Sequence, residues 1–288
     1  MKLSIRSSRL VGKLGFLFLA AFALTGADAP RKPLRVGMVP DAGATQVSVQ
    51  QKLPMQRYLE KALGRPVRLI IPTNYNATVE AIGNGSLDVA YFGGLTYVKA
   101  HIRYGAVPLV QRDIDRQFHS LFIAHAGSGI TKLEDLRGKR FCFGDINSTS
   151  GHLYPSLILK HAGLPASSAL ASFRYTGSHP ATAQAVAAGV CDAGALDETV
   201  FKTLVREGKL KADAVKVFYT SQPFADYVWA ARKGLDAADQ EAFSKALLKL
   251  NPGQDDQVLE ILRGKHFIRA SDDAYSDVAS TAKELGLL

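Results

Sequence analysis

The sequence predicts an α/β protein made of two similar, doubly wound lobes that are joined by a hinge with two chain crossings. Three observations carry this prediction. Strand-like apolar runs alternate with helix-like segments, as is typical of a doubly wound sheet, and this alternation occurs twice. The halves also share a local pattern, at 81–88 and 186–192, in which a helix end and a glycine precede an aspartate that opens a strand. A long third section follows the second unit.

The first half contains short apolar runs such as LRVGMVP and VRLIIPT, which are typical of buried strands, and helix-like segments with glycine stop signals. Its expected strands are 34–40, 67–73 and 87–94, and its expected helices are 47–64 and 77–86.

The second half repeats this order after an extended segment at 119–126. Its expected strands lie in 133–145, 171–177 and 191–197, and its expected helices are 151–163 and 181–189. The third section, with strand-like 215–222 and 227–235 and a helix at 237–250, is too long to extend the second unit and is expected to return to the first.

These segments predict a first lobe of residues 28–117 and 226–288 and a second lobe of residues 118–225. Two crossings between the lobes form a hinge. A hinge between α/β lobes places the ligand in the cleft at the carboxyl ends of the strands.

The N-terminus has the pattern of a secretory signal peptide, which we place at residues 1–27. Four basic residues precede the apolar run 14–24, which is too short to span a bilayer. Cleavage after Ala27 is favoured over cleavage after Ala29, because the latter leaves Pro30 as the first residue. No cysteine lies near the site, so a lipid anchor is disfavoured. We therefore expect a periplasmic protein.

The charge of the chain argues against nucleic acid as a partner. The formal net charge is +9, but the signal segment holds four basic and no acidic residues, which leaves 31 basic against 26 acidic residues. This modest surplus fits small anions or an ordinary surface about equally well. We expect a monomer, no nucleic acid and no cofactor.

Cys142 and Cys191 are the only two cysteines, and each lies in an apolar, strand-like run. Buried free cysteines are the favoured interpretation, and export leaves a disulfide as the alternative. The seven histidines show no pairing with cysteine at ligand spacing, so no metal site is expected.

The loop GDINSTSGHLYPS, at 144–156, places Ser148, Thr149 and Ser150 between a strand and a helix expected to begin near Gly151. Hydroxyl donors next to the positive end of a helix suit an oxyanion. The alternative is a simple N-cap, for which one such residue is enough.

This loop resembles the signature of the phosphonate and phosphite solute-binding proteins of ABC importers, which are type II periplasmic binding proteins. The segments TNYNATVEAIGNGSLDVAYFGGLTYV, TGSHPATAQAVAAG and FADYVWAAR extend the resemblance over nearly the whole chain after the signal segment. It implies that a small phosphorus oxyanion is bound between the lobes, by lobe closure, and passed to an ABC transporter permease. The positions that match the family's binding residues are Tyr75, Phe92, Gly93, Ser148, Thr149, Ser150, His179 and Tyr227.

Tyr227 stands where the phosphite binders of this family have tyrosine and the aminophosphonate binders have aspartate. The resemblance therefore disfavours ligands with an ammonium group, unless neighbouring Asp226 takes that role. Phe92 in place of tyrosine implies a smaller or less hydrated site. Asp197 either accepts a proton from the oxyanion or caps the following helix, and Asp41 is either a cleft residue or a turn former.

Two competing functions remain open from the sequence. A secreted hydrolase is disfavoured, because the chain lacks a G-x-S-x-G elbow and the Ser-Thr-Ser loop has no neighbouring base. A periplasmic sensor that reports an oxyanion such as arsenite to a histidine kinase is the second. Because arsenite favours thiolates, a cysteine at the cleft would support it.

Overall fold

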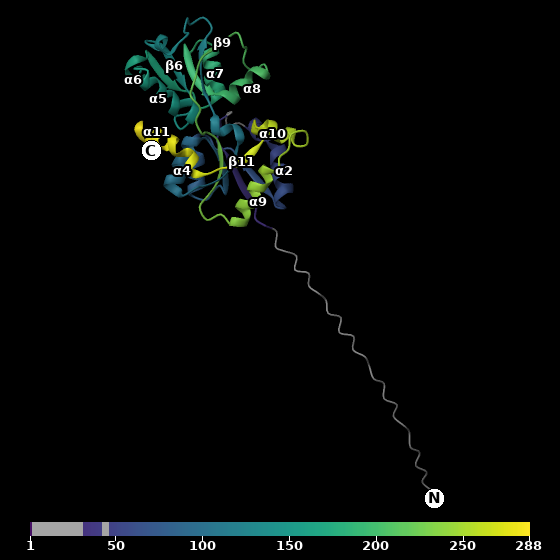
Figure 1. The fold of residues 1–288 in the computed structure, drawn as a ribbon. Coiled ribbons are helices and arrows are strands. Elements are labelled where there is room, and N and C mark those ends of the chain that lie inside the picture. The colour runs from purple at the N-terminus through teal and green to yellow at the C-terminus, as the bar shows by residue number, and fades with distance from the viewer. Residues whose placement is uncertain (2–30, 42–45) are drawn as a thin grey trace. The chain divides into compact units, whose positions relative to one another are not determined.

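The computed structural model describes Met1, residues 31–41 and residues 46–288. Residues Lys32–Leu288 form one compact unit (Figure 1). The predicted signal peptide lies outside the described residues, except for Met1.

The first sheet has six strands in the order β11-β4-β10-β3-β1-β2. Its strands are β1 (Leu34–Met38), β2 (Val67–Ile70), β3 (Val89–Phe92), β4 (Val107–Arg112), β10 (Val228–Ala231) and β11 (Phe267–Arg269). Strands β1, β2 and β3 are parallel, whereas β10 runs antiparallel between β3 and β4. The late part of the chain thus returns to the first sheet, as predicted.

The second sheet has five strands in the order β7-β6-β8-β5-β9. Its strands are β5 (Ser120–His125), β6 (Arg140–Phe143), β7 (Ser172–Tyr175), β8 (Ala193–Asp197) and β9 (Val215–Thr220). Side chains alternate across β5: Phe122 packs in one hydrophobic cluster and Ile123 in another. This alternation explains why helices cover both faces of the sheet, with α5 and α6 on one side and α7 and α8 on the other (Figure 1).

Helices complete the two layers around each sheet. With the first sheet lie α1 (Gln46–Gln51), α2 (Leu53–Leu63), α3 (Tyr75–Gly83), α4 (Gly94–Tyr104), α9 (Ala237–Leu248), α10 (Asp256–Leu262) and α11 (Ser276–Glu284), and with the second lie α5 (Tyr154–His161), α6 (Ala166–Ala169), α7 (His179–Ala187) and α8 (Glu198–Arg206). We call the first set of elements lobe 1 and the second lobe 2. The prediction of two α/β lobes is confirmed, and the limits at 117/118 and 225/226 remain a proposal.

Two predicted helices differ from those observed. The helix expected at 47–64 is divided into α1 and α2, because Pro54 occupies the first turn of α2, where its missing N–H needs no partner. The helix expected from Gly151 begins instead as a π-helical turn, Thr149–Leu153, and α5 follows it.

The preference for free cysteines was wrong, because Cys142 and Cys191 form a disulfide with a Cα–Cα distance of 5.8 Å. Strand β6, which carries Cys142, lies beside β8, and Cys191 comes two residues before β8 begins. The pairing of strands that are distant in the sequence brings the two sulfur atoms together. The spacing of the two cysteines in the sequence does not indicate that these strands are neighbours.

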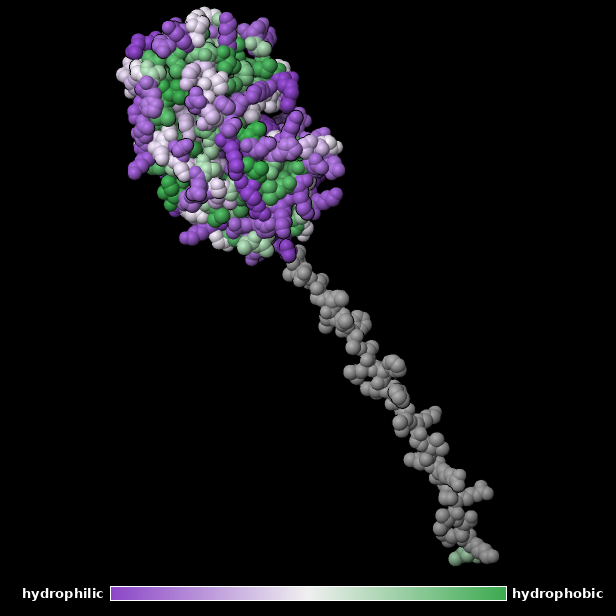
Figure 2. Space-filling model, in the orientation of Figure 1, coloured by the Kyte–Doolittle hydropathy of each residue, from purple (hydrophilic) through white to green (hydrophobic). Residues whose placement is uncertain are grey.

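Two antiparallel segments connect the lobes. The backbone N–H of Phe118 donates to the carbonyl of Phe224 at 2.9 Å, and the N–H of Phe224 donates back at 3.0 Å. In the part of the chain that the structure describes, no helix has the length and apolar character needed to cross a membrane. The face of Lys32–Leu288 shown in Figure 2 mixes hydrophilic and hydrophobic residues in small groups.

Candidate functional site

His179, the first residue of α7, is the centre of a buried polar cluster to which both lobes contribute. Its Nε2 atom lies 3.4 Å from the hydroxyl oxygen of Tyr75 and 3.3 Å from that of Tyr227, both from lobe 1. The backbone N–H of Asp197 donates to Nδ1 at 3.2 Å. Because Nδ1 is an acceptor there, the network assigns the ring proton to Nε2. The imidazole therefore presents one N–H donor toward two tyrosine hydroxyls.

Burial lowers the pKa of His179 below its usual value, although Asp197 and Asp41 oppose this shift. A neutral imidazole follows from this direction and from the hydrogen bond at Nδ1. The two Nε2 contacts share a single N–H, and both are longer than a strong N–H···O bond. One N–H donor and two hydroxyl groups thus face one another at this point.

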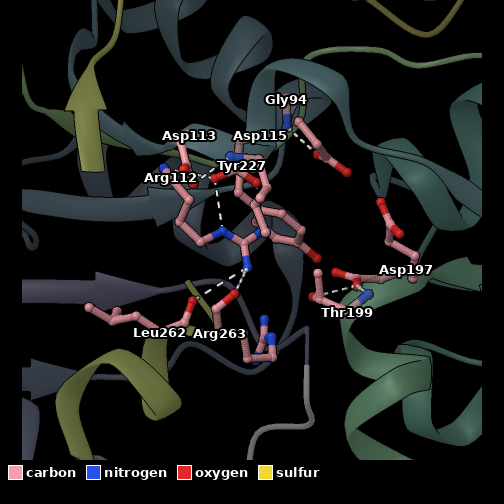
Figure 3. A network of polar contacts seen from close by, with 12 residues as sticks. Gly94, Arg112, Asp113, Asp115, Asp197, Thr199, Tyr227, Leu262 and Arg263 are labelled. Atoms are coloured by element: carbon pink, nitrogen blue, oxygen red, sulfur yellow. Dashed lines mark hydrogen bonds and ion pairs between the residues drawn. The ribbon is translucent and has the colours of Figure 1, made fainter. Parts of the chain in front are cut away.

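Aromatic packing fixes Tyr227. Its ring stacks on that of Tyr91 with centroids 5.0 Å apart and an interplanar angle of 8°, and Phe118 contacts it edge-on at 5.6 Å. The guanidinium of Arg112 lies 5.1 Å above the same ring. Arg112 is itself fully buried in an ion pair with Asp115 (Figure 3). The Tyr227 hydroxyl is thus held toward His179 by a rigid support.

Tyr91 was not among the candidate residues, although it precedes Phe92 in β3. Its hydroxyl is buried and forms no hydrogen bond within the described residues. Phe92 is fully buried in the hydrophobic core of lobe 1. Because side chains alternate along a strand, Tyr91 rather than Phe92 stacks on Tyr227.

The three hydroxyl residues of the loop have different partners. Ser148 caps the following turn, since its Oγ accepts from the N–H of Gly151 at 3.0 Å. The Oγ1 of Thr149 accepts from the N–H of Leu95 at 3.0 Å and so joins lobe 2 to lobe 1. The Oγ of Ser150 is buried and has no hydrogen-bond partner among the residues that the structure describes. Capping therefore accounts for Ser148 but not for Ser150.

Glycine at 151 and 93 allows close approach around this loop. A Cβ at Gly151 would lie 3.2 Å from Cε1 of His179, so the loop packs directly against the imidazole. A Cβ at Gly93 would lie 3.3 Å from the Oγ1 of Thr149. Gly151 thus lets the loop pack against His179 within lobe 2, and Gly93 lets lobe 1 approach the same loop at Thr149.

Asp226 lies at the N-terminus of α4, where its Oδ1 accepts from the N–H of Gly94 at 2.9 Å. Burial raises its pKa to about 7, against the lowering effect of that hydrogen bond and of the Thr149 side chain. One oxygen of Asp226 thus accepts from the first N–H of the helix, and Oδ2 is buried and has no partner in the described part of the chain.

Asp197 caps α8, as one of its two predicted roles requires, and its role toward a ligand stays a prediction. Its Oδ1 accepts from the N–H groups of Thr199 and Val200, while Oδ2 is buried and has no partner among the described residues. Burial alone would raise its pKa, but His179, Arg263 and Arg112 lower it overall. Asp197 is therefore an ionised acceptor.

Asp41 is a turn residue, as one of its two predicted roles requires, and its backbone carbonyl accepts from the N–H of His179 at 3.2 Å. Its carboxylate pairs with Arg263, which follows α10. Sequence reasoning missed Arg263, because an arginine at the end of a helix is usually a solvated partner of the helix dipole. No group of three or more potential metal-binding side chains occurs in residues 31–41 and 46–288.

Two α/β lobes with convergent buried polar side chains define a solute-binding protein. The sequence matches the family described as "ABC transporter, phosphonate, periplasmic substrate-binding protein" over residues 36–275, and the chain belongs to this family.

Three known proteins illustrate the similarity. The chain is 31% identical to the "Probable ABC transporter phosphite binding protein PhnD1" of Prochlorococcus marinus, over 88% of this chain and 90% of that protein. It is 32% identical to the "Phosphate-import protein PhnD" of Mycolicibacterium smegmatis, over 75% and 74%. The crystal structure of Prochlorococcus marinus PhnD1 with methylphosphonate superimposes with a TM-score of 0.84 at 28% identity, over 89% of this chain and 99% of that one.

Proposed function

We propose that this protein captures a small phosphorus oxyanion, phosphite or a short phosphonate, in the periplasm and delivers it to an ABC importer. The observation that carries this proposal is the convergence of neutral donors from both lobes on one buried point. The donors that meet there are Nε2–H of His179 and the hydroxyls of Tyr75 and Tyr227. We add the Ser150 hydroxyl, which forms no hydrogen bond among the described residues and belongs to the loop whose Gly151 packs against His179. The relatives named for phosphite binding and solved with methylphosphonate support the same ligand class.

A tetrahedral oxyanion accepts hydrogen bonds in several directions, which suits donors that come from different elements. Ser150 and His179 would hold it from lobe 2, while Tyr75, Tyr227 and the segment 91–93 would close from lobe 1. Asp197 Oδ2 would accept the proton of a P–OH group. Ser148 and Thr149 shape the loop through their bonds to Gly151 and Leu95.

Hydrogen bonds between the two lobes, next to the proposed binding residues, support closure of the lobes around the ligand. Leu95 donates to Thr149, and His179 donates from its backbone to Asp41. A ligand that contacts both lobes binds the closed state better than the open one and so shifts the population toward closure. Small-angle scattering with and without ligand should show a smaller radius of gyration in the bound protein. An unchanged radius of gyration at ligand saturation would overturn the closure proposal.

The sensor and hydrolase alternatives are less well supported. Both cysteines of the chain are in the disulfide, so neither supplies the thiolate that arsenite favours. His179 contacts two tyrosine hydroxyls and, among the described residues, forms no hydrogen bond with a serine hydroxyl. That arrangement lacks the nucleophile and base pair of a hydrolase.

Calorimetry with a ligand panel tests the proposal. The panel contains phosphite, hypophosphite, methylphosphonate, aminoethylphosphonate, phosphate, sulfate and arsenite. We expect phosphite or methylphosphonate to bind most tightly, and Tyr227→Phe to weaken that binding. Tyr58→Phe is the matched control, because the Tyr58 hydroxyl bonds to the carbonyl of Ala246 far from the site. Tightest binding of arsenite, or no binding of any phosphorus oxyanion, would refute the proposal.

Export through the signal segment and a monomeric state complete the proposal. Mass spectrometry of the protein from the periplasm is expected to show cleavage after Ala27, and light scattering is expected to give the mass of one chain. An uncleaved chain in the cytoplasmic fraction would contradict the proposed location.

A further inference from the structure

A cavity of about 440 Å³ lies beside the His179 cluster. It lies between α2 and the end of α10 in lobe 1 and between α7 and α8 in lobe 2. Pro180, the residue after His179, and Arg263, the partner of Asp41, both line it. This volume is within the range of small-molecule sites and exceeds what a phosphite ion fills. The cavity thus offers room for a substituent on the bound oxyanion.

The end of the cavity nearest His179 is cationic. Lys52 is 9% exposed and the side chain of Arg263 is 12% exposed, and both act electrostatically on one carboxylate, that of Asp41. The acidic residues farther out are already paired, Glu207 with Lys209 at 2.7 Å and Glu260 with Arg206 at 3.2 Å. The inner wall therefore favours a negative charge.

The backbone of Arg263 is held in an unusual conformation that keeps its side chain in the cavity. Its φ of 51° makes it the one non-glycine residue with positive φ in the described part of the chain, at a helix end where glycine is usual. Arg112 donates to the carbonyl of Arg263 at 3.1 Å and to that of Leu262 at 3.4 Å (Figure 3). Glycine adopts this positive φ at a lower energetic cost than arginine, so an arginine at this position suggests that its side chain has a function.

The guanidinium of Arg263 has bonding capacity left. One nitrogen, Nη2, bonds to Asp41, whereas Nε is buried and has no partner in residues 31–41 and 46–288. An arginine fork matches the geometry of a carboxylate, which accepts two parallel N–H bonds. An ammonium group in the same place would be repelled by Lys52 and Arg263.

We propose that this cavity is a subsite for the carboxylate of a carboxyalkylphosphonate, with Arg263 and Lys52 as its cationic wall. The inference rests on the proposed function, since the His179 cluster holds the phosphonate group while the subsite reads the substituent. Phosphonoacetate and 3-phosphonopropionate belong to this class, and 2-aminoethylphosphonate is excluded from it by its charge.

Calorimetry on the exported full-length protein compares methylphosphonate with phosphonoacetate and 3-phosphonopropionate. We expect the better carboxylate ligand to bind at least about tenfold more tightly than methylphosphonate. In Arg263→Gln this advantage should disappear, so that the Kd values of methylphosphonate and of the better carboxylate ligand become equal within about threefold. The exposed Arg269, which pairs with Glu241 on the surface, gives the matched control Arg269→Gln.

Arg263→Gln removes the arginine partner of buried Asp41, so the double variant Asp41→Asn/Arg263→Gln is measured beside it. The same loss of preference in this neutral pair supports the subsite. The proposal is overturned if wild type binds methylphosphonate as tightly as either carboxylate ligand, or if both classes weaken equally in the variants. In that case measurable binding of methylphosphonate leaves the proposed function intact, whereas no binding of any phosphonate removes both.

Discussion

Removing the Ser150 hydroxyl should weaken ligand binding without destabilising the empty protein. Its Oγ is buried and has no partner, so Ser150→Ala deletes no bond from the protein alone. Without ligand, we expect an unchanged or slightly raised free energy of unfolding, because a buried unpaired hydroxyl is unfavourable. With ligand, a donor to an anionic oxygen is lost, which costs about 1.5–3 kcal/mol or roughly 10- to 150-fold in Kd.

Ser148→Ala is the matched comparison in the same loop. It removes the acceptor for the N–H of Gly151 and should lower the free energy of unfolding by about 0.5–2 kcal/mol, as for other lost N-caps. Its Kd for methylphosphonate should stay within about threefold of wild type. Thr149→Ala should affect both quantities, because it leaves the N–H of Leu95 without its partner from lobe 2.

Urea unfolding without ligand and calorimetry with methylphosphonate separate these roles. The two measurements give the free energy of unfolding and the Kd for the same variants. If Ser150→Ala binds like wild type while Ser148→Ala loses affinity, the division of the loop into a cap and a ligand donor is refuted.

Burial lowers the pKa of His179, so we expect the ligand affinity to stay constant from about pH 6.5 to 8, apart from titration of the ligand itself. Calorimetry across that range measures this, and a further change of affinity with pH would show that the imidazole titrates. Asp226 has a pKa raised to about 7, so its contribution to stability is present below the unfolded value of 3.8 and is lost as pH rises through 7. Asp226→Asn should therefore gain up to ~4 kcal/mol over wild type at pH 8, and no such gain at pH 4, in urea unfolding. Reduction of the Cys142–Cys191 disulfide should cost about 2–4 kcal/mol of stability, and a reduced protein as stable as the oxidised one would contradict a structural role. Sulfate should fail to displace methylphosphonate from wild type but should compete with it in Asp197→Asn, because sulfate brings no proton to the ionised Asp197; displacement from wild type would rule out the acceptor role.

Several strands were predictable because they are short apolar runs in the sequence, whereas β4 and β11 were not among the expected strands. LRVGMVP and LDVAYFGG read as strands because both faces of β1 and β3 are covered. Helix α4, which follows β3 in the chain, was not predicted. Seven successive residues from Gly94 to Ala100 are buried, so the helix has no exposed polar face there that would give a helical alternation of apolar and polar residues.

The candidate site was only partly predictable. His179 and the Ser-Thr-Ser loop lie in segments whose pattern could be matched to a family. Tyr91 and Arg263 act through contacts between distant elements, the stack on Tyr227 and the ion pair with Asp41. Arg263 also depends on a positive φ and on support from Arg112, and neither is visible in the letters RGK.

The pairing of buried charges explains how the site can discriminate. Arg112 is neutralised by Asp115, so it supports Tyr227 without adding an unpaired positive charge at the His179 cluster. The ligand is then met by neutral donors, and a binding protein of this kind avoids the cost of desolvating an unpaired cation when it is empty. In the proposed binding mode, the carboxylate of Asp197 adds a requirement for one P–OH proton on the ligand. A second negative charge on the ligand is unfavourable next to Asp197. It is favoured instead beside Arg263 and Lys52, two cations that both interact with the carboxylate of Asp41. The inner donors and the outer cationic wall therefore contact different parts of one ligand. For this reason, a variant at Ser150 should weaken the binding of every phosphonate, whereas a variant at Arg263 should remove the preference for the carboxylate ligands.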